Sequence, residues 1–129
     1  MTLIDPATRV LEHWREGVTT RMLVSAENGA AQLCVFEQWI APGTGAPTHS
    51  HLVEEVLTVV EGEAELWIAE RRMTAKAGQS LIVPAGQKHG FRNSGTATLH
   101  VHAILAAAVF EALPEGATEL TRRWALLKT

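Results

Sequence analysis

The sequence is poor in residues that form covalent cross-links or carry phenolic chemistry. Its 129 residues include one cysteine, Cys34, and no tyrosine. A single thiol excludes an internal disulfide and is typical of proteins of the reducing cytoplasm. Cys34 lies in an apolar, alternating segment, so we expect a small buried side chain and not a nucleophile. The absence of tyrosine excludes a phenol as a proton donor.

The chain also lacks an excess of positive charge and a long apolar run. Its 11 basic and 14 acidic residues give a formal net charge of −3, and the basic residues are scattered or paired, so no nucleic-acid surface is expected. No apolar run reaches about 18 residues, the length of a membrane helix. The opening MTLIDPATRV has no basic stretch before an apolar core, so we expect no signal peptide. These features predict one cytoplasmic domain over residues 1–129, with neither nucleic acid nor membrane as a partner.

Short apolar segments separated by turn residues run through most of the chain. They predict strands over residues 18–25, 32–40, 55–60, 63–69, 80–83 and 99–105, while residues 41–47, rich in glycine and proline, indicate a loop. Helical periodicity is confined to the ends, at residues 7–15 and 119–127. Many short strands at nearly regular spacing are typical of an all-β sandwich or barrel.

The segment HSHLVEE, residues 49–55, brings three metal-binding residue types close together in sequence. On a strand, His49 and His51 would point the same way about 7 Å apart, but Glu55 would lie roughly 13 Å further along. On a helix, His51 and Glu55 would share a face while the two histidines diverge. Neither regular element lets all three reach one ion. The chain would have to bend between His51 and Glu55, with a fourth ligand supplied from elsewhere.

Ten residues at fixed spacing surround this segment. They are Gly43, His49, His51, Glu55, Gly62, Gly78, Pro84, Gly86, His89 and Asn93. Position for position, they resemble the two motifs of the cupin superfamily, G(x)5HxH(x)3E(x)6G and G(x)5PxG(x)2H(x)3N. So many positions at fixed spacing make a specific signal, unlike a lone short motif. The resemblance covers residues 43–93, and the short gap between the motifs resembles compact bacterial single-domain cupins.

The resemblance implies a fold and a site. Cupins are small all-β jelly-roll barrels, also described as double-stranded β-helices. It implies that His49, His51, Glu55 and His89 are metal ligands inside the barrel, with the chain turning after the two histidines and Glu55 opening the next strand. It also implies that Gly62, Gly78 and Gly86 serve tight turns, where a missing Cβ relieves strain, and that Asn93 is structural.

Three neutral imidazoles and one carboxylate form a borderline-hard donor set that can leave one or two positions of an ion open. We therefore expect one divalent transition-metal ion as the cofactor, with Fe, Mn, Ni, Co and Zn as candidates. The same histidines would also suit the polar lining of a cupin that holds no metal. Glu54, beside Glu55, is expected in solvent because its parity points it the other way.

Two further histidines, His100 and His102, share one face of the segment LHVHAIL. If that face lines the barrel, they would be catalytic residues that bind substrate or move protons near neutral pH. If it faces outward, they would be surface or dimer-interface residues. Parity alone does not choose, and we take the inward orientation as the hypothesis. His13 lies in a polar stretch and is expected in solvent.

Two function classes fit these features. The first is a metalloenzyme acting on a small organic molecule, as a dioxygenase, a lyase or decarboxylase, or an isomerase. The second is a non-catalytic cupin that binds a small ligand, with the metal as a structural or ligand-anchoring group. The fold alone does not decide between them.

The expected assembly is a homodimer. Small jelly-roll barrels leave sheet edges and an apolar face that a second copy can cover. Cupins commonly dimerise through their sheets, and the resemblance implies the same here. Four tryptophans, at positions 14, 39, 67 and 124, are also many large aromatic side chains for one small core to hide.

Overall fold

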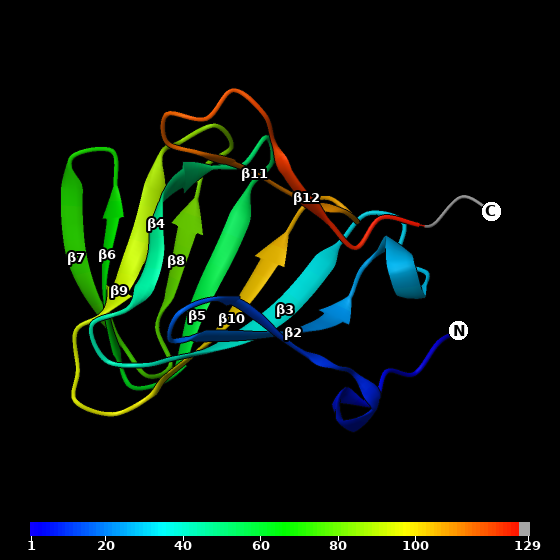
Figure 1. Cartoon of the computed structure of the whole chain (residues 1–129), viewed down its shortest axis with the longest axis horizontal. Coiled ribbons are helices and arrows are strands. Elements are labelled where there is room, and N and C mark those ends of the chain that lie inside the picture. The colour runs from blue at the N-terminus through cyan, green and yellow to red at the C-terminus, as the bar shows by residue number, and fades with distance from the viewer. Residues whose placement is uncertain (127–129) are drawn as a thin grey trace.

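The computed structural model describes residues 1–126, which form two six-stranded antiparallel sheets packed face to face (Figure 1). The strands are β1 (Leu11–Arg15), β2 (Val18–Val24), β3 (Cys34–Ile40), β4 (Gly45–Ser50), β5 (Glu55–Glu61), β6 (Glu63–Ile68), β7 (Arg71–Lys76), β8 (Ser80–Val83), β9 (His89–Asn93), β10 (Leu99–Leu105), β11 (Phe110–Pro114) and β12 (Thr121–Arg123). This confirms the predicted all-β jelly roll.

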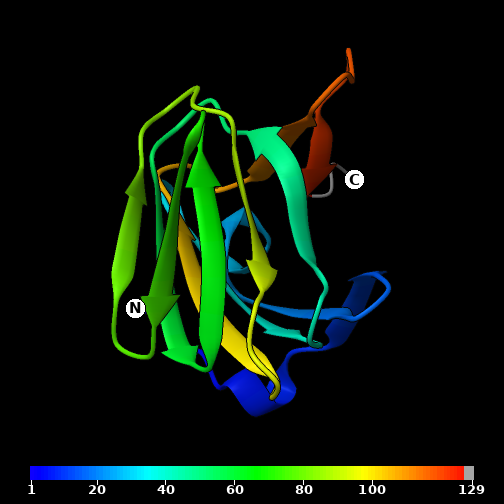
Figure 2. The same ribbon diagram turned by 90° about the vertical axis from the view of Figure 1, so that its left-hand side faces the viewer.

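The order of the strands shows crossovers between the two sheets. One sheet runs β1-β2-β3-β10-β5-β8 and the other β12-β11-β4-β9-β6-β7. Consecutive strands such as β4 and β5 therefore lie in opposite sheets. Figure 2 views the layers from the end where β6, β7 and β9 lie. Because the chain passes from sheet to sheet, residues close in sequence can face each other across the interior.

Alternating side chains from both sheets fill the space between them. On β3, Phe36 and Ile40 are buried in the core, as are Val101 and Ala103 on β10. Cys34 is fully buried in the same core, which confirms its expected role as a small apolar side chain. Burial raises the pKa of its thiol to about 12.

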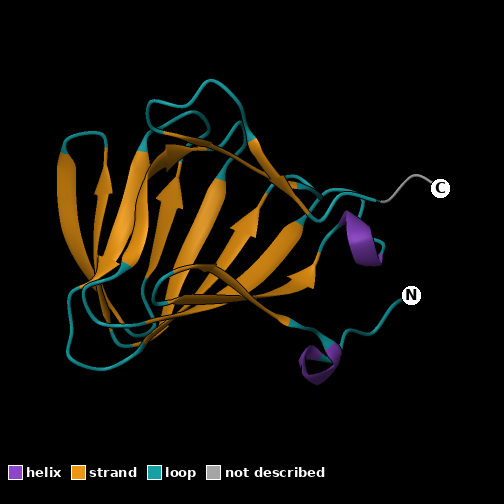
Figure 3. Ribbon diagram, viewed as in Figure 1, coloured by secondary structure: helices purple, strands orange, loops and turns teal. Residues whose placement is uncertain are grey.

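The two predicted terminal helices are wrong. Residues 7–15 form only a 3₁₀ turn, Pro6–Thr8, followed by strand β1 (Figure 3). Strand β1 pairs with β2, with Leu11 opposite Arg21, and this tertiary pairing overrides a weak local helical pattern. The C-terminal segment contains β12, which pairs with β11. Leu127, the last residue of the predicted helix at 119–127, lies outside the described residues.

The turn residues of the two motifs take the roles that the resemblance implies. Gly62, Gly78 and Gly86 have φ angles of 93°, 89° and 79°, a left-handed conformation that glycine adopts without strain. Asn93 is buried, and its amide nitrogen donates hydrogen bonds to the carbonyls of Ile40 (2.9 Å) and Ala97 (2.8 Å). The side chain thus ties β9 to the end of β3 and to the loop before β10.

Among residues 1–126, no helix is both long and apolar enough to cross a membrane.

Candidate metal centre

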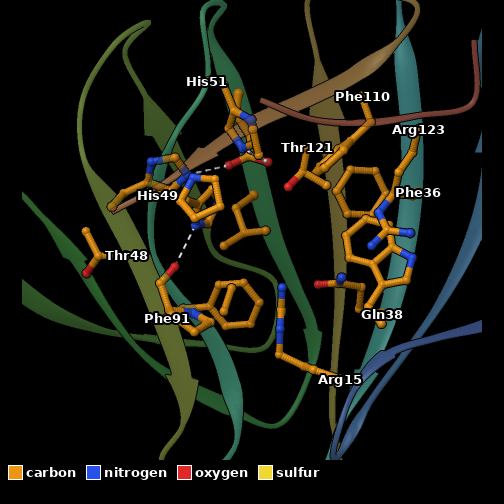
Figure 4. A pocket seen from close by; sticks show the side chains of 18 residues that line it. Arg15, Phe36, Gln38, Thr48, His49, His51, Phe91, Phe110, Thr121 and Arg123 are labelled. Carbon is orange, nitrogen blue, oxygen red and sulfur yellow. Dashed lines mark hydrogen bonds and ion pairs between the residues drawn. The ribbon is translucent and has the colours of Figure 1, made fainter. Parts of the chain in front are cut away.

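The three histidines and Glu55 come from three strands and from both sheets. His49 lies near the end of β4, opposite His89 at the start of β9. The chain bends after His51, and Glu55 opens β5 in the other sheet. The bend required by the sequence spacing is therefore present. All four side chains line one cavity between the sheets, in which Figure 4 shows His49 and His51.

The three imidazole rings converge at short range. The ring centroids of His49 and His89 are 4.3 Å apart, those of His49 and His51 are 4.9 Å apart, and those of His51 and His89 are 5.2 Å apart. Each ring offers one nitrogen within 4.8 Å of the nitrogens offered by the other two. One cation can therefore contact all three rings after small adjustments.

Backbone carbonyls fix which nitrogen of each ring is available. The Nδ1 atom of His49 lies 2.7 Å from the Pro47 carbonyl, and that of His51 lies 2.7 Å from the Glu111 carbonyl. Nδ1 of His89 lies 2.9 Å from the Gln87 carbonyl. A carbonyl only accepts hydrogen bonds, so each Nδ1 must carry its proton and donate it. In the neutral ring, the lone pair then resides on Nε2, the arrangement that metal-ligating histidines use.

Glu55 lies against the two buried rings. One carboxylate oxygen is 3.1 Å from Nε2 of His89, and the other is 3.6 Å from Nε2 of His51. Two ligand atoms about 2.1 Å from a shared ion are themselves roughly 3.0–3.4 Å apart. The contact with His89 falls within this range and the contact with His51 lies slightly above it, so a small movement would let these groups share one ion.

One buried atom in the cluster has no hydrogen-bond partner. Nε2 of His51 is buried and accepts or donates no hydrogen bond within the described part of the chain, because the Glu55 oxygen 3.6 Å away is too far for one; the whole residue is only 3% exposed. An unpaired buried polar atom costs about 1–3 kcal/mol, so it requires a partner that binds a lone pair. A divalent cation held by the three rings and Glu55 meets that requirement. The donor set therefore fits the expected metal.

Burial and neighbouring charges set the protonation of the cluster. Burial and the nearby His89 lower the pKa of His49 to about 4, and burial also lowers that of His51. Burial opposes charge on His89 too, but the contact with Glu55 outweighs it and raises the pKa of that ring. Burial of Glu55 is outweighed in turn by the histidines, which lower the pKa of the carboxyl. Two of the rings are therefore neutral at ordinary pH, as metal ligation requires.

The cavity continues beyond the histidines and has a volume of about 130 Å³. A single water needs roughly 10–15 Å³ on this scale, so the cavity has room for a small organic molecule. Its far wall is formed by aromatic rings and two arginines: Trp14, Phe36, Phe110, Arg15 and Arg123. The sequence analysis did not assign these residues to a cavity, because they come from segments far apart in the chain.

Gln38 is a further cavity residue that the sequence analysis missed. It is only 3% exposed, lines the cavity, and donates a hydrogen bond to the hydroxyl of Thr20 at 3.0 Å. A usable signal was present in the segment CVFEQWI, where Glu37 and Gln38 are adjacent. Adjacent residues of a strand face opposite ways, so one of them had to point into the core.

His100 and His102 do not face the cavity, so their expected orientation is wrong. Val101, between them, is fully buried and pairs with the cavity residue Gln38 on β3. His102 pairs with Glu37 instead, and its side chain is 42% exposed. Both histidines therefore lie on the outer face of the sheet and cannot touch a molecule in the cavity.

On that outer face, the two histidines surround Glu37. Nε2 of His100 is 2.8 Å from one carboxylate oxygen of Glu37, and Nε2 of His102 is 3.4 Å from the same oxygen. The other oxygen pairs with Arg21 at 2.8 Å. The His100 ring also stacks on Trp39, with centroids 4.9 Å apart. Two histidines and one carboxylate at such spacing can hold a cation, but Arg21 already supplies a positive charge to this carboxylate.

Two side chains that were expected in solvent are found there. Glu54 and His13 are exposed, as parity predicted for Glu54 and the polar surroundings predicted for His13. The ring of Trp14 packs against Phe36, Phe110 and Trp124, with centroids 5.0–5.7 Å apart.

Comparison with known proteins gives one family and a set of shared folds. The family model described as "Cupin domain" matches residues 36–105. Auxin-binding protein 1 of Arabidopsis thaliana is 28% identical over 91 residues, which cover 64% of this chain and 46% of that protein. The chain therefore spans about half the length of this curated relative.

Two solved structures illustrate the shared fold. The polyketide cyclase RemF of Streptomyces resistomycificus has a TM-score of 0.76 at 22% identity, over 92% of this chain and 88% of that one. An oxalate decarboxylase of Lactobacillus farciminis has a TM-score of 0.74 at 19% identity, over 81% of this chain and 33% of that one. At such identities the likeness concerns the fold alone.

Proposed function

The chain belongs to the cupin family, and from this premise we propose that it is a metal-dependent enzyme acting on a small organic molecule. One divalent transition-metal ion, among Fe, Mn, Ni, Co and Zn, would be held by His49, His51, His89 and Glu55. The observation that carries the proposal is the convergence of three imidazole rings, each with a nitrogen within 4.8 Å of the others, whose Nδ1 atoms are all hydrogen-bonded to backbone carbonyls.

The residues around the ion define what the cavity can do. A bound divalent ion would supply Lewis-acid polarisation of a substrate oxygen or, with a redox metal, access to O₂ chemistry. Leu57, Phe91 and Phe110 surround the histidines with apolar side chains, which exclude water and strengthen electrostatic contacts there. Among the described residues lining the cavity, Glu55 is the one carboxylate. Proton transfer at a bound substrate would therefore fall to Glu55 or to solvent at the mouth of the cavity.

Enzymes and a ligand-binding protein both occur among the proteins that resemble this chain, so the comparisons leave a second function open. A polyketide cyclase and an oxalate decarboxylase are enzymes, whereas Auxin-binding protein 1 is named for the ligand it binds. The cavity has aromatic walls, and its described lining residues include no acid–base side chain other than the proposed metal ligands and two arginines. Such a cavity would also suit ligand capture. The alternative function is thus a non-catalytic small-molecule binder in which the ion anchors the ligand.

Turnover separates the two functions. Protein loaded separately with Fe(II), Mn(II), Ni(II), Co(II) or Zn(II) is incubated with a panel of small organic molecules, and O₂ consumption and product formation are followed. The enzyme reading predicts turnover with at least one metal and loss of that turnover in Glu55→Gln. Ligands that bind to every metal form and leave unchanged would contradict catalysis and support the binder.

We also propose that the chain forms a homodimer through the outer face of the sheet β1-β2-β3-β10-β5-β8. Cross-strand pairing places β-branched aliphatic residues side by side on five strands of this sheet: Val24, Val35, Ile104, Val56 and Ile82. Within this aliphatic row, Ile104 is 40% exposed and Ile82 is 62% exposed. A two-fold axis lets the same patch pack against itself, which would cover the row.

A substitution within the aliphatic row tests the dimer. Ile104→Glu should give a monomer by light scattering at micromolar concentration, because it would place a charge in the interface centre. Val10→Glu is the matched control, since Val10 is 70% exposed and lies outside the strands. A wild-type protein that is already monomeric, or a dimer that tolerates Ile104→Glu, would contradict this interface.

The proposed location is the cytoplasm. Its support is that the one cysteine, Cys34, is a buried thiol that serves packing, as reducing compartments favour.

A further inference from the structure

Two arginines lie at the side of the cavity across from the histidines. Arg15 ends strand β1 and Arg123 ends strand β12, so the two termini of the described fold bring them together. Figure 4 shows the Arg15 side chain reaching into the cavity from below and Arg123 lying beside Phe36. Neither residue belongs to the motifs that carry the metal ligands.

These arginines have little negative charge to balance them. Arg15 donates one long hydrogen bond, 3.3 Å, to the carbonyl of Gly45, and it makes no ion pair with the described residues. Arg123 has a weak ion pair of 3.9 Å with Glu12, whose oxygens also accept hydrogen bonds from the indoles of Trp14 and Trp124 at 3.3 and 2.9 Å. Nε of Arg123 is buried and finds no hydrogen-bond partner among residues 1–126.

The charges inside the cavity therefore favour an anion. Glu55 is the one acidic residue among the described side chains of the lining, and it contacts His51 and His89. Arg15 is exposed and Arg123 is half-buried; partial burial and the nearby charge of Arg123 lower the pKa of Arg15, as expected for like charges held close together. A divalent ion at the histidines would add further positive charge. Planar guanidinium groups bind carboxylates through paired hydrogen bonds.

The wall beside the arginines is aromatic. The Phe36 and Phe110 rings lie 5.6 Å apart edge to face, and Trp14 is 5.0 Å from Phe110. The guanidinium of Arg123 lies over the Trp14 ring, 4.1 Å from its centroid. This stacking fixes the orientation of Arg123 without using its N–H groups. The same surface that orients the charge thus offers flat apolar area to the body of a ligand.

We propose that the cavity binds a small organic acid with a planar apolar body, whose carboxylate is bound by Arg15 and Arg123. This assignment rests on the proposed function, because it names the substrate class of the same cavity. The aromatic wall takes the body of the acid, and the opposite end of the molecule lies toward His49, His51 and His89. Arg15 and Arg123 are the residues that distinguish acids from neutral analogues.

The experiment compares an acid with its neutral isostere. Zinc-loaded protein is titrated by calorimetry with phenylacetate and with phenylacetamide, which has nearly the same shape and no charge. Phenylacetate should bind at least about tenfold more tightly, the effect of one charge-assisted hydrogen-bonding partner. Arg15→Gln and Arg123→Gln should each reduce phenylacetate affinity by about tenfold and leave zinc content unchanged.

Arg122→Gln is the matched control. Arg122 neighbours Arg123 on β12, but it is 59% exposed, pairs with Glu111 and does not line the cavity. Its substitution should leave phenylacetate affinity at the wild-type value. Because Arg123 packs on Trp14, Arg123→Gln could also disturb the fold. In that case the affinity of the Arg15→Gln variant, altered at the other terminus, still tests the proposal.

Three results would overturn the assignment: no binding of phenylacetate at millimolar concentration, equal binding of acid and amide, or wild-type affinity in both folded arginine variants. The last result would mean that the carboxylate is bound by the ion alone and not by the arginines. Zinc content of the same samples separates this outcome from the proposed function. Protein that takes up no zinc but prefers the acid contradicts the metal site and supports the arginine subsite, whereas zinc-loaded protein without that preference contradicts the subsite alone.

Discussion

Replacing Asn93 by alanine should destabilise the fold while leaving the proposed metal ligands in place. The Asn93 side chain makes three buried or half-buried hydrogen bonds, donating to the carbonyls of Ile40 and Ala97 and accepting from the backbone N–H of Gly95 at 2.9 Å. Each such bond contributes about 1 kcal/mol, and the backbone groups left unpaired add to the loss. We therefore expect the free energy of unfolding to fall by about 3 kcal/mol.

The size of this loss can be compared with the stability of the whole domain. Domains of this kind unfold with about 5–15 kcal/mol, and a domain of this length should lose roughly 10 °C in melting temperature for about 3 kcal/mol. Urea unfolding and thermal melting of wild type and Asn93→Ala measure the difference. Ser94→Ala is the control, because Ser94 is exposed and its substitution should change stability by less than about 0.5 kcal/mol.

The outcome separates two roles for this motif position. A stable Asn93→Ala protein that has lost its metal would refute the structural role and place Asn93 in the site. A destabilised protein that still takes up metal in its folded fraction would agree with the observed hydrogen bonds, which reach backbone groups and not the histidines.

Three further predictions follow from protonation and burial. Burial alone would raise the pKa of Glu37, but hydrogen bonds from His100 and Arg21 outweigh it and lower the pKa. The ionised carboxylate therefore stabilises the fold above its unfolded pKa, and this stabilisation should be lost as pH falls through the lowered value. In urea unfolding at a series of acid pH values, Glu37→Gln should lose stability less steeply than wild type, and identical slopes would contradict the network. Because the pKa of His89 is raised above its usual value of about 6.5, protons should compete with Zn²⁺ for this ring already above that pH, and the affinity should decline as pH falls through the raised value. An affinity for Zn²⁺ that calorimetry finds independent of pH would mean that histidines are not the ligands. The buried Cys34 thiol, with a pKa of about 12, should resist a thiol reagent at pH 8 until the protein is unfolded, and rapid labelling of the folded protein would contradict its burial.

Most of the proposed ligand set could be predicted from the sequence because it depends on local spacing. The pair His49 and His51 and the bend before Glu55 are fixed by seven consecutive residues. His89 could be added through its motif, since its distance from Pro84 and Gly86 sets the turn that begins β9. Strands with apolar alternation, such as residues 99–105, were also predicted with the bounds that the structure shows.

Two parts failed for different reasons. In LHVHAIL, Leu99, Val101, Ala103 and Leu105 form a wholly apolar face that the structure buries, whereas the other face carries both histidines and Ile104, so the alternation itself indicated that His100 and His102 face outward and the inward hypothesis gave it too little weight. Residues 7–15, by contrast, carry a pattern compatible with a helix, and only pairing with β2 makes them a strand. The cavity wall could not be predicted either, because only the tertiary fold brings Arg15, from one end of the chain, to the same cavity as Arg123, from the other.

The most direct test of the metal centre is the metal content of three proteins prepared in parallel. Wild type, His89→Ala and His102→Ala are reconstituted with Zn²⁺, freed of unbound metal and analysed for zinc per chain. The account predicts about one zinc in wild type and in His102→Ala, whose ring lies on the outer face, and a large loss in His89→Ala. A wild-type value near zero, or zinc that is lost from His102→Ala and kept by His89→Ala, would contradict it.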